Sequence, residues 1–161
     1  MVHWMMLLAS APEPAGPEAV LRRFAPEDQP LSKELAPAEG GWVVSSQGRH
    51  VYRLFEVADP GVEQAMLAYR ADLKAEGLKG SLWRKGRAYL EMWCRFPGRG
   101  EFFSKGFHDA VSGTTDWVSC QTPFYLKAGE RPDLIKLNLV VEGAGTVWIR
   151  NVELVRAPLK G

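Results

Sequence analysis

The sequence predicts an all-β sandwich or barrel of about eight antiparallel strands, and three observations carry that prediction. After Gly41, apolar and polar residues alternate with a period of two, which places one row of side chains on a core face and the other row outside. Turn residues such as Gly, Pro and Asp separate the alternating stretches at short intervals. No helical period lies between these stretches, and the alternation of the two faces favours antiparallel pairing.

The first forty residues lack this alternation and are expected to form an irregular leader or linker. Six of the eleven prolines precede residue 40, and each one removes a backbone donor and biases the preceding residue towards an extended conformation. One short helix is expected within PEAVLRRF (17–24), because Pro17 and Glu18 suit the first turn of a helix.

The extreme N-terminus, MVHWMMLLASAPEP, contains a short apolar run before small residues. Ala9-Ser10-Ala11 resembles a small-residue cleavage site, which is typical of the remnant of a secretory signal, but His3 is a poor substitute for a Lys/Arg-rich start. Export to the periplasm, cell envelope or extracellular space therefore remains open beside a cytoplasmic location. The run is too short to cross a bilayer, and no other segment is apolar enough for a membrane span.

The alternating region is expected to form one domain, residues 41–157, followed by a tail, residues 158–161. A chain of 161 residues is long enough for one domain with a real core and too short for two comfortable ones. The candidate strands are WVVSS (42–46), HVYRLFEV (50–57), EQAMLAYRADLKA (63–75), GRAYLEMWCRF (86–96), GEFFSKGF (100–107), DWVSCQTPFYL (116–126), DLIKLNLVVE (133–142) and GTVWIRNVELVR (145–156).

Bulk composition excludes several classes of function. Hydrophobic and charged contents of 46% and 24% are typical of a soluble globular protein. A net charge of +1, without an evident cluster of Lys and Arg along the sequence, argues against nucleic acid as a partner. The two cysteines make no disulfide framework and no zinc-binding spacing, and no glycine-rich phosphate loop is present, so no cofactor and no metal site is expected.

The stretch YLEMWCRF (89–96) contains the most unusual strand face. In an extended chain, Leu90, Met92, Cys94 and Phe96 share one row, which is an ordinary core face. The other row sets two large aromatic rings beside an acid and a base: Tyr89, Glu91, Trp93 and Arg95. This second row is therefore the first candidate for a binding surface.

Two motifs near the end of the chain resemble a known family. VSGTTDW (111–117) and GAGTVWIRNVEL (143–154) resemble jelly-roll modules of the galactose-binding-like superfamily, and more narrowly carbohydrate-binding modules found beside bacterial glycosidases. AYLEMWCRFPGRGEFF and RPDLIKLNLVVEG also resemble an uncharacterised bacterial family of such domains. The resemblance implies a jelly-roll β-sandwich in which the second, fourth, fifth and seventh candidate strands form one sheet and the other four form the second sheet.

In that strand order, the seventh candidate strand lies beside the fourth and extends the unusual face. The expected ligand-binding residues are Trp93, Glu91, Arg95, Tyr89, Asn138, Lys136 and Arg53, with Trp83 as a contact from a rim loop. A sugar packs its C–H face on an aromatic ring while its hydroxyls bond to planar amide, carboxylate and guanidinium groups. Carbohydrate binding is thus one interpretation, through the sheet face or the rim loops. A second interpretation is a structural ladder of cross-strand pairs. A third is a face for a protein partner of the cell envelope.

Two further tryptophans receive structural interpretations. Trp117 directly precedes an apolar alternation, so we expect it to plug one end of the core. Trp148 has the outward parity of its strand, and we expect the leader residues Val20, Leu21 and Phe24 to fold back over it.

Related carbohydrate-binding modules often carry an acidic residue, sometimes part of a calcium site, where this chain has Arg150. A cation offers no lone pair to a metal ion, so a calcium site at this position is not expected, and Asp72 is expected to pair with Arg150 across strands. Cys94 and Cys120 fall on opposite sheets in this order. Sheets pack about 10 Å apart, so two buried thiols are favoured over a disulfide.

Catalysis is not expected. His108, Asp109 and Ser112 are neighbours in sequence, and such neighbours rarely adopt the geometry of a nucleophile, base and orienting acid. Glu91 and Glu101 are two carboxylates with nothing nearby in the sequence to separate their roles as acid and base. The sequence therefore predicts a non-catalytic binding module rather than an enzyme.

Overall fold

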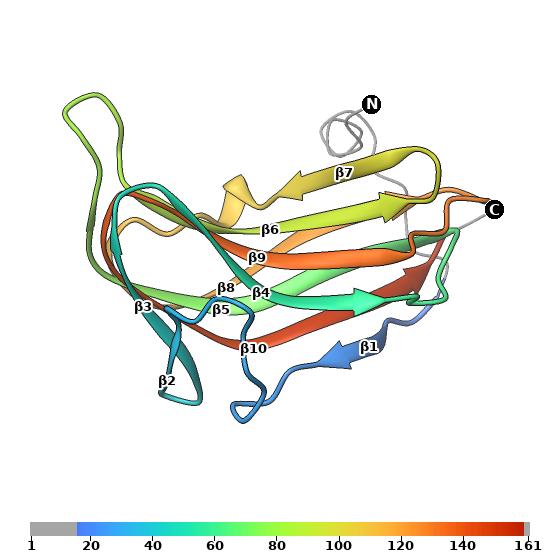
Figure 1. The fold of residues 1–161 in the computed structure, drawn as a ribbon, viewed down its shortest axis with the longest axis horizontal. Helices are drawn as coiled ribbons and strands as arrows, with labels where there is room; N and C mark the ends of the chain where they lie inside the picture. The colour runs from blue at the N-terminus through green and yellow to red at the C-terminus, as the bar shows by residue number, and fades with distance from the viewer. Residues whose placement is uncertain (1–15, 160–161) are drawn as a thin grey trace.

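The computed structural model describes residues 16–159, and these form a β-sandwich whose longer strands run along the long axis of the molecule (Figure 1). The strands are β1 (Ala19–Arg23), β2 (Ala36–Ala38), β3 (Gly41–Gln47), β4 (His50–Ala58), β5 (Ala65–Lys79), β6 (Arg87–Phe96), β7 (Gly100–Lys105), β8 (Gly113–Leu126), β9 (Leu134–Glu142) and β10 (Ala144–Pro158). One short 3₁₀ helix, η1 (Phe107–Asp109), follows β7. The predicted all-β sandwich of antiparallel strands is confirmed.

The two sheets have the strand order that the resemblance implies. The larger sheet has the order β2-β3-β10-β5-β8, with β1 added beside β10, and the smaller sheet has the order β4-β9-β6-β7. All of these pairings are antiparallel. The eight candidate strands correspond to β3 to β10, and each one lies in its expected sheet.

The core lies between the sheets and is filled by the inward rows of the long strands. β5 contributes Leu67, Tyr69 and Leu73, none of which is exposed. β6 and β9 face them with Leu90, Met92, Ile135 and Leu137. The Tyr69 hydroxyl donates to the backbone carbonyl of Asn138 (3.1 Å), so one buried hydrogen bond joins the two sheets.

The expected leader differs from the structure in two segments, residues 19–23 and 36–38, which form strands. Residues 19–23 form strand β1 rather than a helix, and Ala19 and Arg23 pair with Arg156 and Glu153 of β10. Eight residues are too few for a stable helix without packing, whereas the edge of β10 offers backbone partners. Residues 31–32 donate to carbonyls of β4, and β2 pairs with β3. Residues 19–38 therefore act as a strap that contacts both sheets, and the sandwich begins before residue 41.

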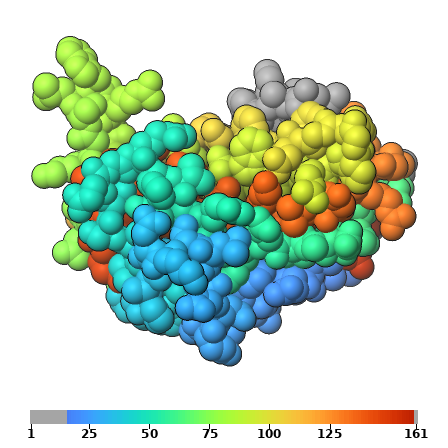
Figure 2. Space-filling model, in the orientation of Figure 1, coloured from blue at the N-terminus to red at the C-terminus, as the bar shows by residue number. Residues whose placement is uncertain are grey.

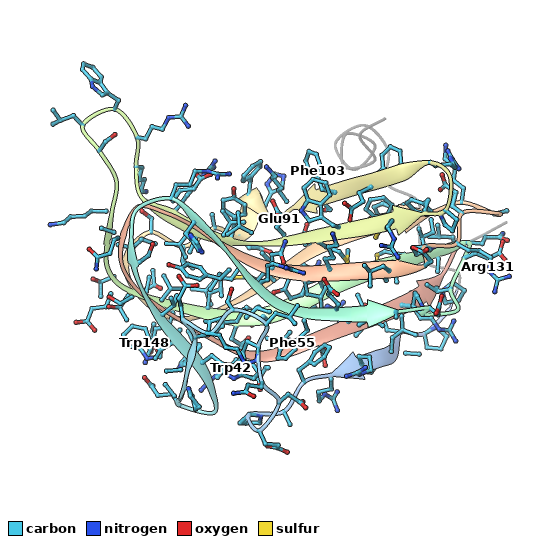
Figure 3. The ribbon with its side chains drawn as sticks, in the orientation of Figure 1. Trp42, Phe55, Glu91, Phe103, Arg131 and Trp148 are labelled. Carbon is cyan, nitrogen blue, oxygen red and sulfur yellow. The ribbon has the colours of Figure 1, made fainter. Side chains whose placement is uncertain are left out.

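Phe24 anchors this strap. Its side chain is 5% exposed and stacks on Phe55 at 4.0 Å between ring centroids, while Trp42 meets Phe55 edge-on at 5.4 Å (Figure 3 shows Trp42 and Phe55). Phe55 turns inward because the register shifts between Arg53 and Phe55, so both Leu54 and Phe55 are buried. The expected cover of Trp148 is wrong, because β1 pairs with residues 153–156 and Phe24 lies on Phe55.

The two cysteines are free and buried, as the sheet separation predicts. No helix among residues 16–159 has the length and apolar character that crossing a membrane requires. The expected remnant of a secretory signal falls on residues 1–15, which lie outside the described residues.

Replacing the strap anchor tests whether the strap is part of the fold. We predict that Phe24→Ala lowers the free energy of unfolding by about 3 kcal/mol, because a stacked, buried ring is lost. Val20→Ala, at a position that is 47% exposed, changes it by less than about 0.5 kcal/mol. Chemical denaturation followed by fluorescence measures both. Equal stabilities for Phe24→Ala and the parent protein would mean that residues 19–38 are a loose linker.

The thiols give a second test of the core. Burial raises the pKa of Cys94 well above its usual value and, with Asp109 nearby, raises the pKa of Cys120 to about 12. At pH 8 both thiols therefore stay protonated and shielded. We expect no reaction with an aromatic disulfide reagent in the native state and release of two equivalents after denaturation. Rapid labelling of the native protein would contradict this packing.

Candidate functional site

Seven of the eight residues expected to bind a ligand come from three strands of the smaller sheet. Glu91 pairs with Asn138, Trp93 with Lys136, and Arg53 with Asn138. The sequence therefore places these side chains on one outer face correctly. Their exposure is uneven, because Glu91 and Asn138 are 4% and 6% exposed. Figure 3 shows Glu91 on the side of the molecule that also carries Phe103 of β7.

Glu91 is the centre of a closed network. Its Oε1 accepts a hydrogen bond from the Trp93 indole nitrogen (2.9 Å) and another from Asn138 Nδ2 (3.0 Å). Lys105 Nζ lies 3.8 Å from its other oxygen. The Trp93 ring packs at 5.1 Å on Phe103. The polar groups that a sugar would need are already bonded to one another, which is the arrangement of a structural ladder.

The cations of this face are also paired. Arg95 donates to Asp133 (2.9 Å), Lys136 lies 2.8 Å from Glu101, and Arg53 donates to Glu56 (2.7 Å). Each pair is partly exposed, so solvent screens the attraction and each pair contributes little to stability. A ligand on this face would have to displace these partners as well as compete with the Glu91 network.

Tyr89 is not available to a ligand. It is 1% exposed, its ring meets Phe107 of η1 edge-on, and its hydroxyl donates to Glu142 (3.0 Å). Burial, and then the bond to Glu142, raise the pKa of Tyr89 far above its ordinary value, so the phenol stays neutral. Trp83 lies in the loop between β5 and β6 and is 90% exposed. It does not share the face of β6 and β9.

The side chains that might have suggested catalysis have other partners. The Ser112 hydroxyl donates to the carbonyl of Gly86, and a carboxylate oxygen of Asp109 accepts from the backbone nitrogen of Gln121 (3.0 Å). Neither side chain bonds to His108 among the described residues. Glu91 accepts from Trp93 and Asn138, and Glu101 is paired with Lys136. None of these groups forms a nucleophile–base arrangement in residues 16–159.

A second aromatic surface lies on the outer face of the larger sheet. Lys74 of β5 lies between two indole rings, with its Nζ 5.1 Å from the Trp117 ring centroid and 4.7 Å from that of Trp148. Trp148 pairs directly with Lys74, and both tryptophans are partly exposed. The expectation that Trp117 plugs the core is wrong, because Trp117 points outward beside Lys74 and Arg150.

The next rows of this face carry polar groups. Arg150 pairs with Asp72, their side chains approach to 3.5 Å, and the guanidinium of Arg150 stacks 3.9 Å above the Trp117 ring centroid. The cross-strand pairing predicted for Arg150 is confirmed. Asp72 also accepts from Asn151 (2.7 Å). Arg70 donates to Gln121 (3.0 Å) and to Glu18 (2.7 Å), which directly precedes the strap.

These polar rows form the floor of a groove of about 760 Å³. Arg23, Phe24 and Pro26 of the strap line one side, and Asp109 lines the other. The floor residues come from β5, β8 and β10, and one of them lies where the register of β10 shifts. They are Arg70, Asp72, Ser119, Gln121, Asn151 and Glu153. Asn151 has a φ of +56°, which lets its side chain join the groove where β10 shifts register.

Part of this site can be predicted from the sequence. The outward parity of Trp148 and the alternation of Trp117, Ser119 and Gln121 both indicate an exposed row on the larger sheet. The missing information was that the leader closes one side of a groove instead of covering Trp148. No alternation pattern predicts where a proline-rich segment without periodicity will pack.

The chain matches no known protein-family model and no curated protein sequence. Solved structures do resemble it. The CBM22-1 and GH10 modules of a Clostridium thermocellum endo-1,4-β-D-xylanase, in complex with xylohexaose, match with a TM-score of 0.51 at 10% identity over 89% of this chain and 26% of that one. At this identity the likeness shows a shared fold alone.

Two further structures have TM-scores of 0.47. The CBM22-1 xylan-binding domain from Paenibacillus barcinonensis is 9% identical over 91% of this chain and 99% of that one, and a Stig cyclase from Fischerella is 13% identical over 92% and 81%. This chain spans about half (53%) of another matched chain, from the carbohydrate-binding modules of the β-sandwich superfamily. The predicted resemblance to the jelly-roll sandwich of such modules is confirmed at the level of the fold.

The network around Glu91 makes a testable contribution to stability. We predict that Trp93→Phe lowers the free energy of unfolding by about 1 kcal/mol, because the ring contact survives while the donor to a buried carboxylate is lost. Trp148→Phe is the matched control, since no hydrogen bond of its indole nitrogen is formed within the described residues, and it should cost less than about 0.5 kcal/mol. Urea titration compares the two. A neutral Trp93→Phe would show that the network does not stabilise the fold.

Proposed function

We propose that this protein is a non-catalytic carbohydrate-binding module whose ligand lies in the groove on the outer face of the larger sheet. The observation that carries the proposal is the row Trp148–Lys74–Trp117 beside a groove with a floor of planar polar groups. A pyranose ring needs both parts together, an aromatic face for its C–H groups and amides or carboxylates for its hydroxyls.

The groove retains polar groups for a ligand. Gln121 accepts from Arg70 through its Oε1, and its amide nitrogen has no partner among residues 16–159. Asn151 donates to Asp72 through its Nδ2, which leaves its carbonyl oxygen as an acceptor. The closed network around Glu91 on the other sheet offers fewer such positions. This difference supports the larger sheet over the face that the sequence first indicated.

The charges of the groove favour a neutral sugar. Arg23 pairs with Glu153 (3.1 Å), Arg70 with Glu18, and Arg150 with Asp72 (3.5 Å), so positive and negative groups alternate along the floor and walls. No single sign of charge dominates a field that would select an acidic polymer. The likeness in fold to a xylanase module in complex with xylohexaose agrees with a neutral oligosaccharide as the ligand class.

The carboxylates of the groove support binding rather than hydrolysis. Glycoside hydrolysis needs one protonated carboxyl group and one ionised carboxylate that face the same bond. Here Asp72 is bonded to Asn151 and lies beside Arg150, and Glu153 is bonded to Arg23. The proposal therefore assigns these groups to positioning of the floor.

Binding to neutral oligosaccharides tests the proposal. We predict that a glycan array, followed by titration with xylohexaose and other neutral hexasaccharides, detects a ligand, and that Trp117→Ala and Trp148→Ala each weaken its binding by at least about tenfold. Melting temperatures of both variants should stay close to that of the parent protein.

Trp93→Phe is the matched control for the other sheet and should bind as the parent does. Loss of binding in Trp93→Phe with retention in Trp148→Ala would place the site on the smaller sheet. A blank array for the folded protein would remove carbohydrate as the ligand class.

A further inference from the structure

The loop between β5 and β6, residues 80–86, extends well beyond the body of the sandwich, as the light-green projection in Figure 2 shows. Its apex holds two adjacent apolar side chains, Leu82 and Trp83, which are 96% and 90% exposed. These are the two most exposed large hydrophobic residues in the described chain. A loop that needed Trp83 as an internal anchor would have packed it against the sandwich edge.

The loop is built to hold this apex outward. The Ser81 hydroxyl accepts from the backbone nitrogens of Trp83 and Arg84 (3.2 Å each), which fixes the turn at the tip. At the neck, a Cβ on Gly80 would lie 2.0 Å from the carbonyl oxygen of Arg84, and a Cβ on Gly86 would lie 2.4 Å from the backbone of Lys79. Only glycine permits this close approach of the two backbone segments at the neck of the loop. The apex is therefore held in place by defined local structure.

Cations surround the base of the loop. A hollow of about 700 Å³ beneath the apex is lined by Arg49, Lys79, Arg84, Lys85 and Arg87, and by a single acid, Glu142. Glu142 is bonded to Arg87 (2.6 Å) and lies 3.7 Å from Arg49. Lys79, Arg84 and Lys85 have no acidic partner among residues 16–159. Four of these five cations lie within residues 79–87 and the fold adds Arg49, so positive charge is concentrated here in a chain with a net charge of +1.

We propose that this loop docks the protein onto an anionic lipid surface, with Leu82 and Trp83 in the interfacial region and the surrounding cations at the level of the lipid phosphates. Trp favours the boundary between headgroups and acyl chains, and Lys and Arg near that plane are attracted to anionic lipid. The loop presents both the tryptophan and the cations at one projecting tip.

The shape of the tip favours a bilayer over other partners. A stable protein–protein interface buries about 800 Å² on each partner, which a convex apex of two side chains does not provide. A sugar would need polar partners beside the ring, whereas Trp83 is adjacent to Leu82 and its surroundings are open. A fluid interface adapts to a small convex apex, and its negative charge matches the cations behind it.

Sedimentation with vesicles tests the docking. Vesicles of phosphatidylcholine with 30% phosphatidylglycerol should sediment the protein at 50 mM salt, and pure phosphatidylcholine should not. We expect Leu82→Ser/Trp83→Ser to abolish binding. Arg84→Glu/Lys85→Glu should weaken it by roughly 25-fold or more, at about fivefold for each basic residue. Lys33→Glu/Lys127→Glu changes the net charge equally at exposed positions away from the loop and should bind as the parent does.

Quenching by brominated lipid identifies the residue that enters the interface. Trp83→Phe should retain most vesicle binding. It should lose the share of the fluorescence quenching that Trp83 contributes in the parent protein. Trp148→Ala should bind vesicles normally, so that this inference and the proposed sugar site succeed or fail separately. Equal binding to neutral and anionic vesicles, no binding to either, or full binding by the apex variant would overturn the proposal. Binding of the loop to an acidic polysaccharide without binding to vesicles would also overturn it.

Discussion

The pairing of β5 with both β10 and β8 is the constraint on which the rest of the structure depends. β5 lies between β10 and β8 in the larger sheet, and its inward row, with Leu67, Tyr69 and Leu73 fully buried, fixes which side of the strand faces the core. A slip of one residue would move this entire row to the outside. The same register sets the outward row, in which Lys74 lies between the rings of Trp148 and Trp117. Core packing and the proposed site are thus two consequences of one alignment.

The two sheets expose surfaces of different character. On the smaller sheet, Glu91 accepts from both Trp93 and Asn138, so the aromatic and polar groups bond to one another. On the larger sheet, the strap raises one wall of a groove, and Gln121 and Asn151 keep polar atoms directed to its space. The same residue types therefore bond to one another on one face and keep unbonded polar atoms on the other. The difference is whether a neighbouring strand has already satisfied them.

Alternation was sufficient to predict β3 to β10 from the sequence, because a period of two reports directly which side chains face the core. The resemblance added the distribution of these strands between the sheets. Alternation alone was not sufficient where a register shift interrupts the period of two. The register shift after Arg53 buries Phe55, and the shift around Asn151 directs an amide into the groove. The sequence predicts a linker over the strap because prolines interrupt any alternation there, and its two short strands form only by pairing with strands of the larger sheet. Four of the five cations around Glu142 lie within residues 79–87 of the sequence, and the fold adds Arg49 from the turn between β3 and β4.

The central claim, that a sugar lies against Trp117 and Trp148, is tested most directly by the indole N–H signals of the six tryptophans in a two-dimensional ¹H–¹⁵N spectrum. During titration with the oligosaccharide selected by the array, the signals of Trp117 and Trp148 should shift together and saturate at the same ligand concentration. The signals of Trp42, in the core, and of Trp93, in the Glu91 network, should stay in place. A spectrum in which Trp93 shifts while Trp117 and Trp148 do not would contradict the account.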